Sequence, residues 1–264
     1  MRALFFHYFG YAILHNIRSD DMSIALDSLG LFNNSYPAGY DNGDPWLIAV
    51  LLMFVVSLIA SGSVQRTFKR FASIPAQSGT VAAQMAQNML YDAGSNVTVT
   101  QVSGSLTDHF NPKTGVVGLS DAVYDQSSVS ALAVAAHEIG HVMQYQEGYT
   151  PIKIRNFILP VARIGSGIAP YMIILSLILG ATGLGMAGLI LYAAVFLFQI
   201  ATLPVEFNAS RRALNMLTAG GYIGYDQEAS AKKVLNASAM TYVVAALATF
   251  VSLLRFASLL NRRR

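Results

Sequence analysis

The sequence predicts a mostly α-helical membrane protein. We expect about four transmembrane or membrane-associated helices and a small α+β cytoplasmic domain that contains a β-hairpin. Three observations support this fold class. First, 54% of the residues are hydrophobic and only 12% are charged, which is too apolar for an ordinary soluble domain. Second, the apolar residues are gathered in long runs. Third, a polar, turn-rich stretch of domain size separates the first two runs.

The long apolar runs define the predicted membrane segments. Residues 46–64 form the first transmembrane helix. Residues 156–205 form a helical hairpin, because Ile164–Val205 has no charged residue and glycines near its middle indicate a turn. Residues 239–264 form a fourth hydrophobic helix and a basic tail, with Arg255 close enough to the helix end to reach the interface. Buried core helices are the alternative, and they are least plausible for the uncharged run.

Residues 1–45 form an N-terminal extension of a different kind. Ala3–Leu14 is apolar but too short to span a bilayer. It makes a poor signal peptide, since it lacks a small-residue cleavage site. The following polar, turn-rich residues indicate an interfacial or loosely ordered segment.

Clusters of basic residues predict the orientation in the membrane. One cluster follows the first span, one precedes the hairpin, and one lies between the hairpin and the fourth helix. The positive-inside rule places residues 65–155 and 206–238 in the cytoplasm. The basic tail does not fit, so either the fourth helix lies in the interface or the rule is broken locally. Because topology accounts for the basic residues, the net charge of +3 does not indicate nucleic-acid binding.

Segment 65–155 is expected to hold the soluble structure. Thr80–Tyr91 has helical periodicity and Val97–Val102 alternates as a strand. Leu106–Phe110 and Val116–Leu119 flank an Asn-Pro-Lys-Thr-Gly turn signal, which predicts the β-hairpin.

The segment ends in the sequence His137-Glu138-Ile139-Gly140-His141, which is an H-E-x-x-H motif. It lies in a predicted helix from Ser130 to Gln146, with Ser128 or the serine before it as N-cap. Two histidines four residues apart share one helix face and can bind one Zn²⁺. Glu138 is then placed to act as general base. The chain has no cysteine, so a third ligand must be His, Asp or Glu.

Glu206 is the strongest candidate for the third ligand. It directly follows the uncharged run, and an acid at the membrane interface is costly unless it has a partner. Glu147 is less suitable because it lies on the motif helix itself, about two turns beyond His141. Asp226 and Glu228 have the surroundings of solvated loop residues.

Three stretches of the sequence resemble the YugP-like membrane zinc metallopeptidases, also known as the neutral zinc metallopeptidase family. These stretches are Leu106–Pro112, Ala135–Val142 and Leu203–Arg212. The resemblance extends from about Asp44 to the C-terminus. The order of parts is also similar to that of the HtpX and CAAX prenyl protease group. The resemblance to the zinc metallopeptidase family implies a bacterial cell-membrane protein with a zincin-like, gluzincin-like domain.

The resemblance also implies roles for individual residues. His137 and His141 would bind one Zn²⁺, Glu206 would be its third ligand, and Glu138 would be catalytic. In the wider group an acid four residues after the ligand glutamate orients a histidine, but here that residue is Ser210. Asn208 and Ser210 are the candidates to replace the acid through a hydrogen bond.

The predicted function is a membrane-embedded zinc endopeptidase that hydrolyses membrane-associated or unfolded polypeptides at the cytoplasmic face. Water activated by zinc would attack the scissile carbonyl, with Glu138 as general base. His109, Tyr145 and Arg211 are candidate donors to the oxyanion. Neither the substrate nor the oligomeric state follows from the sequence.

The strand before the motif helix is a candidate substrate edge. Val116, Val117, Gly118 and Leu119 could pair with an extended polypeptide by strand addition. An ordinary structural hairpin is at least as plausible.

Two rival functions are considered. One is a non-catalytic membrane scaffold with a structural zinc site, closed by a fourth protein ligand such as His109. The other is an intramembrane protease of the site-two type, with the motif inside a spanning helix. The polar residues Gln144–Gly148 at the end of the motif helix argue against the second rival.

Overall fold

Four long helices dominate the protein. The structure is a computed structural model that describes residues 45–261, so the extension predicted before Pro45 and the basic tail lie outside the described residues. Each of the four helices is long and apolar enough to cross a membrane. They are α3 (Pro45–Ala72), α6 (Thr150–Leu179), α7 (Thr182–Ala219) and α8 (Glu228–Asn261), the last preceded by the short 3-10 helix η1 (Tyr225–Gln227).

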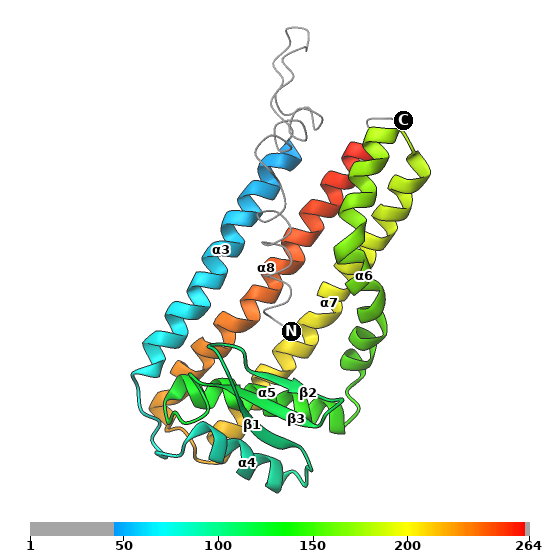
Figure 1. Cartoon of the computed structure of the whole chain (residues 1–264). Helices are drawn as coiled ribbons and strands as arrows, with labels where there is room; N and C mark the ends of the chain where they lie inside the picture. Colours follow the sequence, from blue (N-terminus) through cyan, green and yellow to red (C-terminus); the bar gives the residue numbers. More distant parts are fainter. Residues whose placement is uncertain (1–44, 262–264) are drawn as a thin grey trace.

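The long helices run side by side as one bundle (Figure 1). α6 contacts α7 along the hairpin, α7 contacts α8, and α8 contacts α3. Helix α8 lies along its neighbours and ends at the end of the bundle opposite α5 (Val129–Gln146). This arrangement favours a fourth span over a helix that lies flat in the interface.

The hairpin of long helices turns where the glycine signal predicted it. Gly180 ends α6 in the left-handed conformation, with φ of 65°. Both helices extend beyond the predicted 156–205 boundaries, because α6 begins at Thr150 and α7 passes through Pro204 to Ala219. Glu206 therefore lies within a helix rather than after one. The extension is stabilised by packing, since α7 residues beyond Pro204 are buried against α5.

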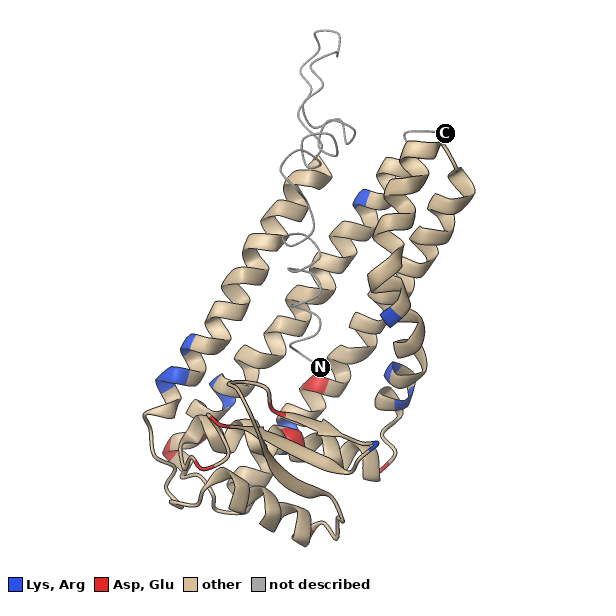
Figure 2. Cartoon of the chain, in the orientation of Figure 1, with Lys and Arg blue, Asp and Glu red and all other residues tan. Residues whose placement is uncertain are grey.

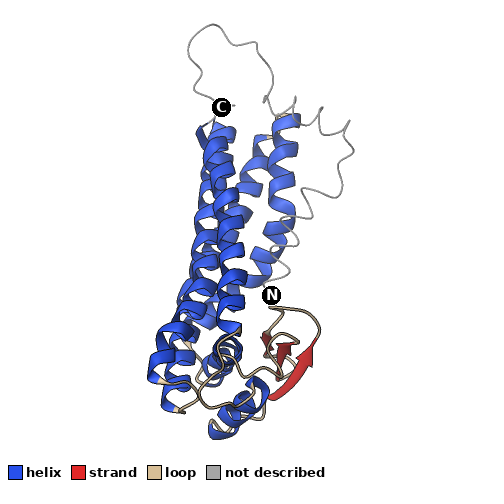
Figure 3. Ribbon diagram, turned by 90° about the vertical axis from the view of Figure 1, so that its left-hand side faces the viewer, coloured by secondary structure: helices blue, strands red, loops and turns tan. Residues whose placement is uncertain are grey.

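Charged residues are concentrated at one end of the bundle (Figure 2). The same end carries α4 (Ala82–Asp92), α5 and the small sheet. The shafts of the long helices are largely uncharged. Figure 3 shows from the side that the strands are confined to this end. The distribution matches an apolar membrane region with a polar domain on one side of it.

The sheet has three strands, in the order β1-β3-β2. They are β1 (Thr98–Val102), β2 (His109–Asn111) and β3 (Val116–Ser120). β2 pairs with β3 in antiparallel fashion, and β1 pairs with β3 in parallel. The strand predicted from Leu106 begins only at His109, because Leu106 has φ of 58°, which is incompatible with extended backbone.

The predicted substrate edge was wrong. Val116, Val117, Gly118 and Leu119 belong to β3, which is the central strand. Its backbone pairs with β1 on one side and with β2 on the other. Val116, Val117 and Gly118 are therefore paired on both sides and offer no free edge to an incoming polypeptide. The outer strands of the sheet are β1 and β2.

The polar domain shares its hydrophobic core with the long helices. Met85, Leu119 and Leu132 represent α4, β3 and α5 in this core, and each is fully buried. The same cluster includes residues of three long helices: Phe68 and Phe71 of α3, Ala213 and Leu217 of α7, and Ala231, Val234 and Leu235 of α8. The domain is thus anchored by burial against the ends of these helices, and the motif helix is held at the same junction.

Candidate metal centre

Helix α5 carries the H-E-x-x-H motif and begins where its cap was predicted. The hydroxyl of Ser128 accepts a hydrogen bond from the backbone N–H of Ala131 at 3.3 Å. The helix ends at Gln146, with Gly148 in the left-handed conformation just beyond. Most of α5 is buried, including Ala135, Ala136 and Ile139 around the motif. The motif histidines are therefore presented from a rigid, well-packed helix.

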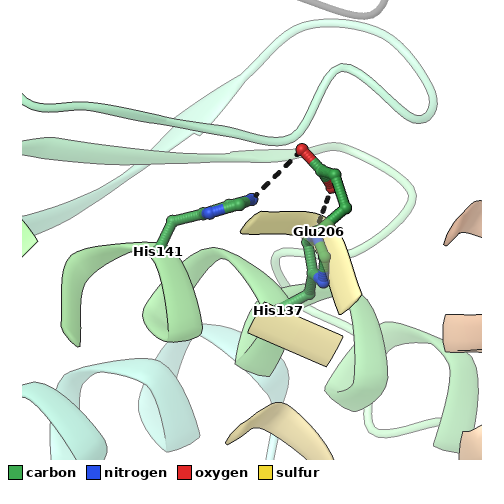
Figure 4. A group of neighbouring side chains, drawn as sticks. All are labelled: His137, His141 and Glu206. Atoms are coloured by element: carbon green, nitrogen blue, oxygen red, sulfur yellow. Dashed lines mark hydrogen bonds and ion pairs between the residues drawn. The ribbon is translucent and has the colours of Figure 1, made fainter. Parts of the chain in front are cut away.

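His137 and His141 lie on one face of α5, and Glu206 of α7 faces both (Figure 4). The Glu206 carboxylate oxygens lie 3.2 Å from His137 Nε2 and 3.8 Å from His141 Nε2. The two imidazole rings meet edge to face, with centroids 4.8 Å apart. His137 and Glu206 are buried, and His141 is half-buried. Residues that are 69 positions apart in the chain thus converge on one point.

The three side chains fit a zinc ion. One ligand atom from each lies within 4.8 Å of the other two. Ligand atoms bound to one tetrahedral zinc at about 2.0–2.1 Å lie about 3.3 Å apart, which small side-chain movements would reach. Two histidines and a glutamate are a known catalytic zinc set, and they leave the fourth position free. Among the described residues, no other His, Asp or Glu belongs to this group.

Gly140 allows α7 to approach the motif helix closely. A Cβ atom on Gly140 would lie 2.7 Å from the backbone oxygen of Ala209, which is closer than atoms can pack. Ala209 is three residues beyond Glu206 on the same face of α7. The glycine inside the motif therefore sets the spacing between the two helices that supply the ligands.

We expect Gly140→Ala to destabilise the protein and weaken zinc binding together. The added methyl group must push against α7 backbone, and such overpacking typically costs about 1–3 kcal/mol. Thermal unfolding and zinc titration of the purified protein measure both effects. Gly167→Ala in α6 is the matched control, since its Cβ would meet nothing within 4 Å. Equal behaviour of the two variants would contradict the assigned role of Gly140.

A polar side chain lies within hydrogen-bond distance of the Nδ1 atom of each histidine. Ser210 Oγ lies 3.3 Å from His137 Nδ1, as the sequence analysis suggested for Ser210. Asn208 does not contact a histidine directly. Its side-chain oxygen accepts from Gln144, and Gln144 Oε1 lies 2.9 Å from His141 Nδ1. Gln144 was missed by the sequence analysis, although a glutamine three residues after the second motif histidine was a usable signal.

Burial lowers the pKa of the His141 imidazole below its usual value, and the nearby Glu206 carboxylate opposes this shift. A metal binds the neutral form of histidine. The lowered pKa therefore keeps His141 ready to bind at pH values where an exposed histidine would be protonated.

Glu138 lines a small cleft together with His137. The cleft lies between α5, α3 and α8. Most of its other lining residues are apolar: Val64, Phe68, Leu106, Val134, Val234 and Leu235, with Asp108 and Ser238 as the polar members. Glu138 is half-buried there. A carboxylate that follows the ligand His137 directly and lines a cleft is placed to exchange protons with a molecule bound there.

The three proposed oxyanion donors lie in different environments. His109 is the first residue of β2, and its Nδ1 lies 2.9 Å from the Thr107 carbonyl oxygen. The Tyr145 hydroxyl accepts a hydrogen bond from Asn156 at 2.8 Å. Arg211 is exposed on α7. All three remain candidates for the oxyanion role.

The chain is similar to known proteins over most of its length. Residues 46–261 match the family model described as "Putative neutral zinc metallopeptidase". The chain is 42% identical over 206 residues to a Bacillus subtilis (strain 168) protein described as "Putative membrane protease YugP". That alignment covers 76% of this chain and 90% of the relative. No solved structure matches the chain.

Proposed function

The chain belongs to the neutral zinc metallopeptidase family, and on this premise we propose that it is a membrane-embedded zinc endopeptidase. Its substrates are membrane-associated or unfolded polypeptides. The observation that carries the proposal is the convergence of His137, His141 and Glu206, with Glu138 beside them in a cleft. A ligand set of two histidines and one glutamate makes the centre gluzincin-like.

The proposed reaction needs residues that bind zinc and a residue that transfers protons. Zinc bound by His137, His141 and Glu206 would act as a Lewis acid. It would lower the pKa of its bound water toward neutrality and polarise the scissile carbonyl. Glu138 accepts the proton of the attacking water and later delivers it to the leaving amine. The apolar walls of the cleft reduce the local water content, which strengthens the electrostatic interactions inside it. Buried side chains around the histidines hold them in place for this work.

β2 is the strand that we assign to substrate pairing. Of the two outer strands, β2 contacts the motif helix and β1 contacts α4. A polypeptide added beside β2 would run past α5, with its backbone held by main-chain hydrogen bonds. His109 and Phe110 are the first residues of this strand.

The active site is proposed to face the cytoplasm. The basic clusters predicted to be cytoplasmic lie in the last turns of α3, in the first half of α6, and on α7 and α8 on either side of the loop that joins them. Figure 2 shows basic residues at the end of the bundle that carries α5. The positive-inside rule supports this side. The intramembrane rival is disfavoured because α5 is not one of the candidate spans.

The cleft beside Glu138 predicts a preference for apolar side chains next to the scissile bond. Val134→Phe should narrow the cleft, and the ratio of kcat/KM values for leucine and alanine peptides should fall by about 10-fold or more, in line with the loss of one or two methylene contacts. Val161→Phe, on an exposed face of α6, is the control. If both variants leave the ratio unchanged, the cleft does not bind the substrate side chain.

The direct test of function uses the full chain purified in detergent micelles with unfolded casein as substrate. Cleavage should disappear after treatment with a chelator and return with added zinc. Full cleavage by protein that contains no metal would overturn the proposal. The non-catalytic scaffold predicts no cleavage under any metal condition, and a fourth protein ligand on zinc.

A further inference from the structure

Gln144 is a buried amide whose hydrogen bonds are all accounted for. It lies on α5 one turn beyond His141 and is fully buried. Its Nε2 donates to the Val205 carbonyl oxygen at 2.8 Å and to Asn208 Oδ1 at 2.9 Å. Its Oε1 lies 2.9 Å from His141 Nδ1. A buried amide is costly unless paired, so these partners define how Gln144 must sit.

The orientation of the Gln144 amide is not interchangeable. The Val205 carbonyl oxygen can only accept, so it requires the amide nitrogen of Gln144. The Asn208 oxygen also acts as an acceptor, because Arg212 Nε donates to it at 2.8 Å. Both hydrogens of the Gln144 amide are thereby used, and its oxygen must face His141.

This orientation decides which nitrogen of His141 carries the hydrogen. An amide oxygen only accepts, so His141 Nδ1 must donate to Gln144. The other ring nitrogen, Nε2, then keeps its lone pair and faces Glu206. The Glu206 oxygen is 3.8 Å from that nitrogen, too far for a competing hydrogen bond. The lone pair needed for metal binding therefore points at the proposed zinc position.

An ion pair fixes the far end of this chain of hydrogen bonds. The Arg212 guanidinium donates two hydrogen bonds of 2.6 Å each to the two carboxylate oxygens of Glu147. Such a two-point pair sets the plane of the guanidinium, and with it the direction of the Nε–H toward Asn208. Glu147 caps the C-terminus of α5 and Arg212 lies on α7, so the pair also ties the two helices together.

We propose that Gln144 is a positioning residue that holds His141 in the tautomer able to bind zinc, and that Asn208, Arg212 and Glu147 hold Gln144. The proposal deepens, and rests on, the zinc-peptidase function. His137 lacks an equivalent device, because the Ser210 hydroxyl beside its Nδ1 can either donate or accept. The two ligand histidines are thus supported in different ways.

The first test reads the tautomer directly. The full chain is labelled with ¹⁵N-histidine, purified in micelles and freed of metal. NMR then distinguishes protonated from bare ring nitrogens, and the signals of His141 are assigned by their loss in His141→Asn. Wild-type protein at a pH where the ring is neutral should show the hydrogen on Nδ1, and Gln144→Met should shift it toward Nε2. A wild-type ring protonated on Nε2 would overturn the proposal.

The second test measures zinc affinity by competition with a chelator. Gln144→Met should weaken binding by roughly 10–100-fold, the usual cost of losing a side chain that orients a metal ligand. Gln146→Met, an exposed change on the same helix, is the control. Equal affinities for these two variants would contradict the proposal.

A pair of variants at Asn208 covers the case in which Gln144→Met does not fold. Asn208→Asp keeps an acceptor for both Arg212 and Gln144, so zinc affinity should stay close to wild type. Asn208→Leu removes the acceptor and should weaken binding. Equal losses in both variants would refute the chain of hydrogen bonds.

Neither readout depends on peptide cleavage. A protein with the predicted tautomer that cleaves no polypeptide would contradict the proposed function and leave this inference standing. A protein that cleaves normally with the other tautomer would do the reverse.

Discussion

Glu138→Gln should abolish peptide cleavage while zinc remains bound. The amide has nearly the shape of the carboxylate but cannot take a proton from water, and a positioned general base contributes roughly 10²–10⁴-fold to the rate. His137, His141 and Glu206 are unchanged in this variant, so the metal group is preserved. The measurements are kcat on an unfolded substrate and zinc content of the same preparation.

Glu228→Gln is a suitable control for this variant. Glu228 lies in the first turn of α8, outside the metal group, and its replacement should leave turnover unchanged. Normal turnover by Glu138→Gln would rule out the proposed chemistry. Loss of zinc along with activity would instead assign Glu138 to metal binding, although Glu138 does not belong to the group of His137, His141 and Glu206 that could hold the ion.

Glu206→Ala should lose zinc as well as activity. The variant removes one of three ligands and leaves two histidines around an empty space. Losing an outer partner of a metal ligand costs roughly 10–100-fold in affinity, and losing the ligand itself should cost more. Metal analysis after dialysis, followed by chelator competition, measures the effect. Activity should return only partially at high zinc concentration, because the ion is then held by two protein ligands.

Asn215→Ala provides the control on the same helix, at an exposed position two turns beyond Glu206. It should bind zinc as wild type does. If Glu206→Ala also keeps full zinc affinity, the third ligand has been assigned wrongly, and the convergence of α7 on the motif helix serves only packing.

The local parts of the site could be predicted from the sequence. The motif, its N-cap at Ser128 and the one-face placement of His137 and His141 follow from spacing within one helix. Glu206 could be predicted because an acid beside an uncharged run needs a partner. The apolar runs predicted the four long helices, since length and composition suffice for that inference.

Features that depend on distant partners could not be predicted in this way. The strand at Val116–Ser120 looked like an edge because its sequence shows one hairpin partner and not the parallel pairing with β1. Helix α7 continues through Pro204 because α5 buries the residues beyond it. The spacing of Gln144, three residues after His141, was a usable local signal, but its partners Val205 and Asn208 lie on α7 and could not be predicted.

The most direct measurement is an X-ray or electron-microscopy structure of the full chain loaded with zinc, with the ion identified by its anomalous signal or by X-ray absorption. The structural account predicts one ion within about 2.0–2.2 Å of nitrogens of His137 and His141 and of an oxygen of Glu206, with no further protein ligand. An ion bound elsewhere, or bound by both histidines with Glu206 turned away, would contradict it.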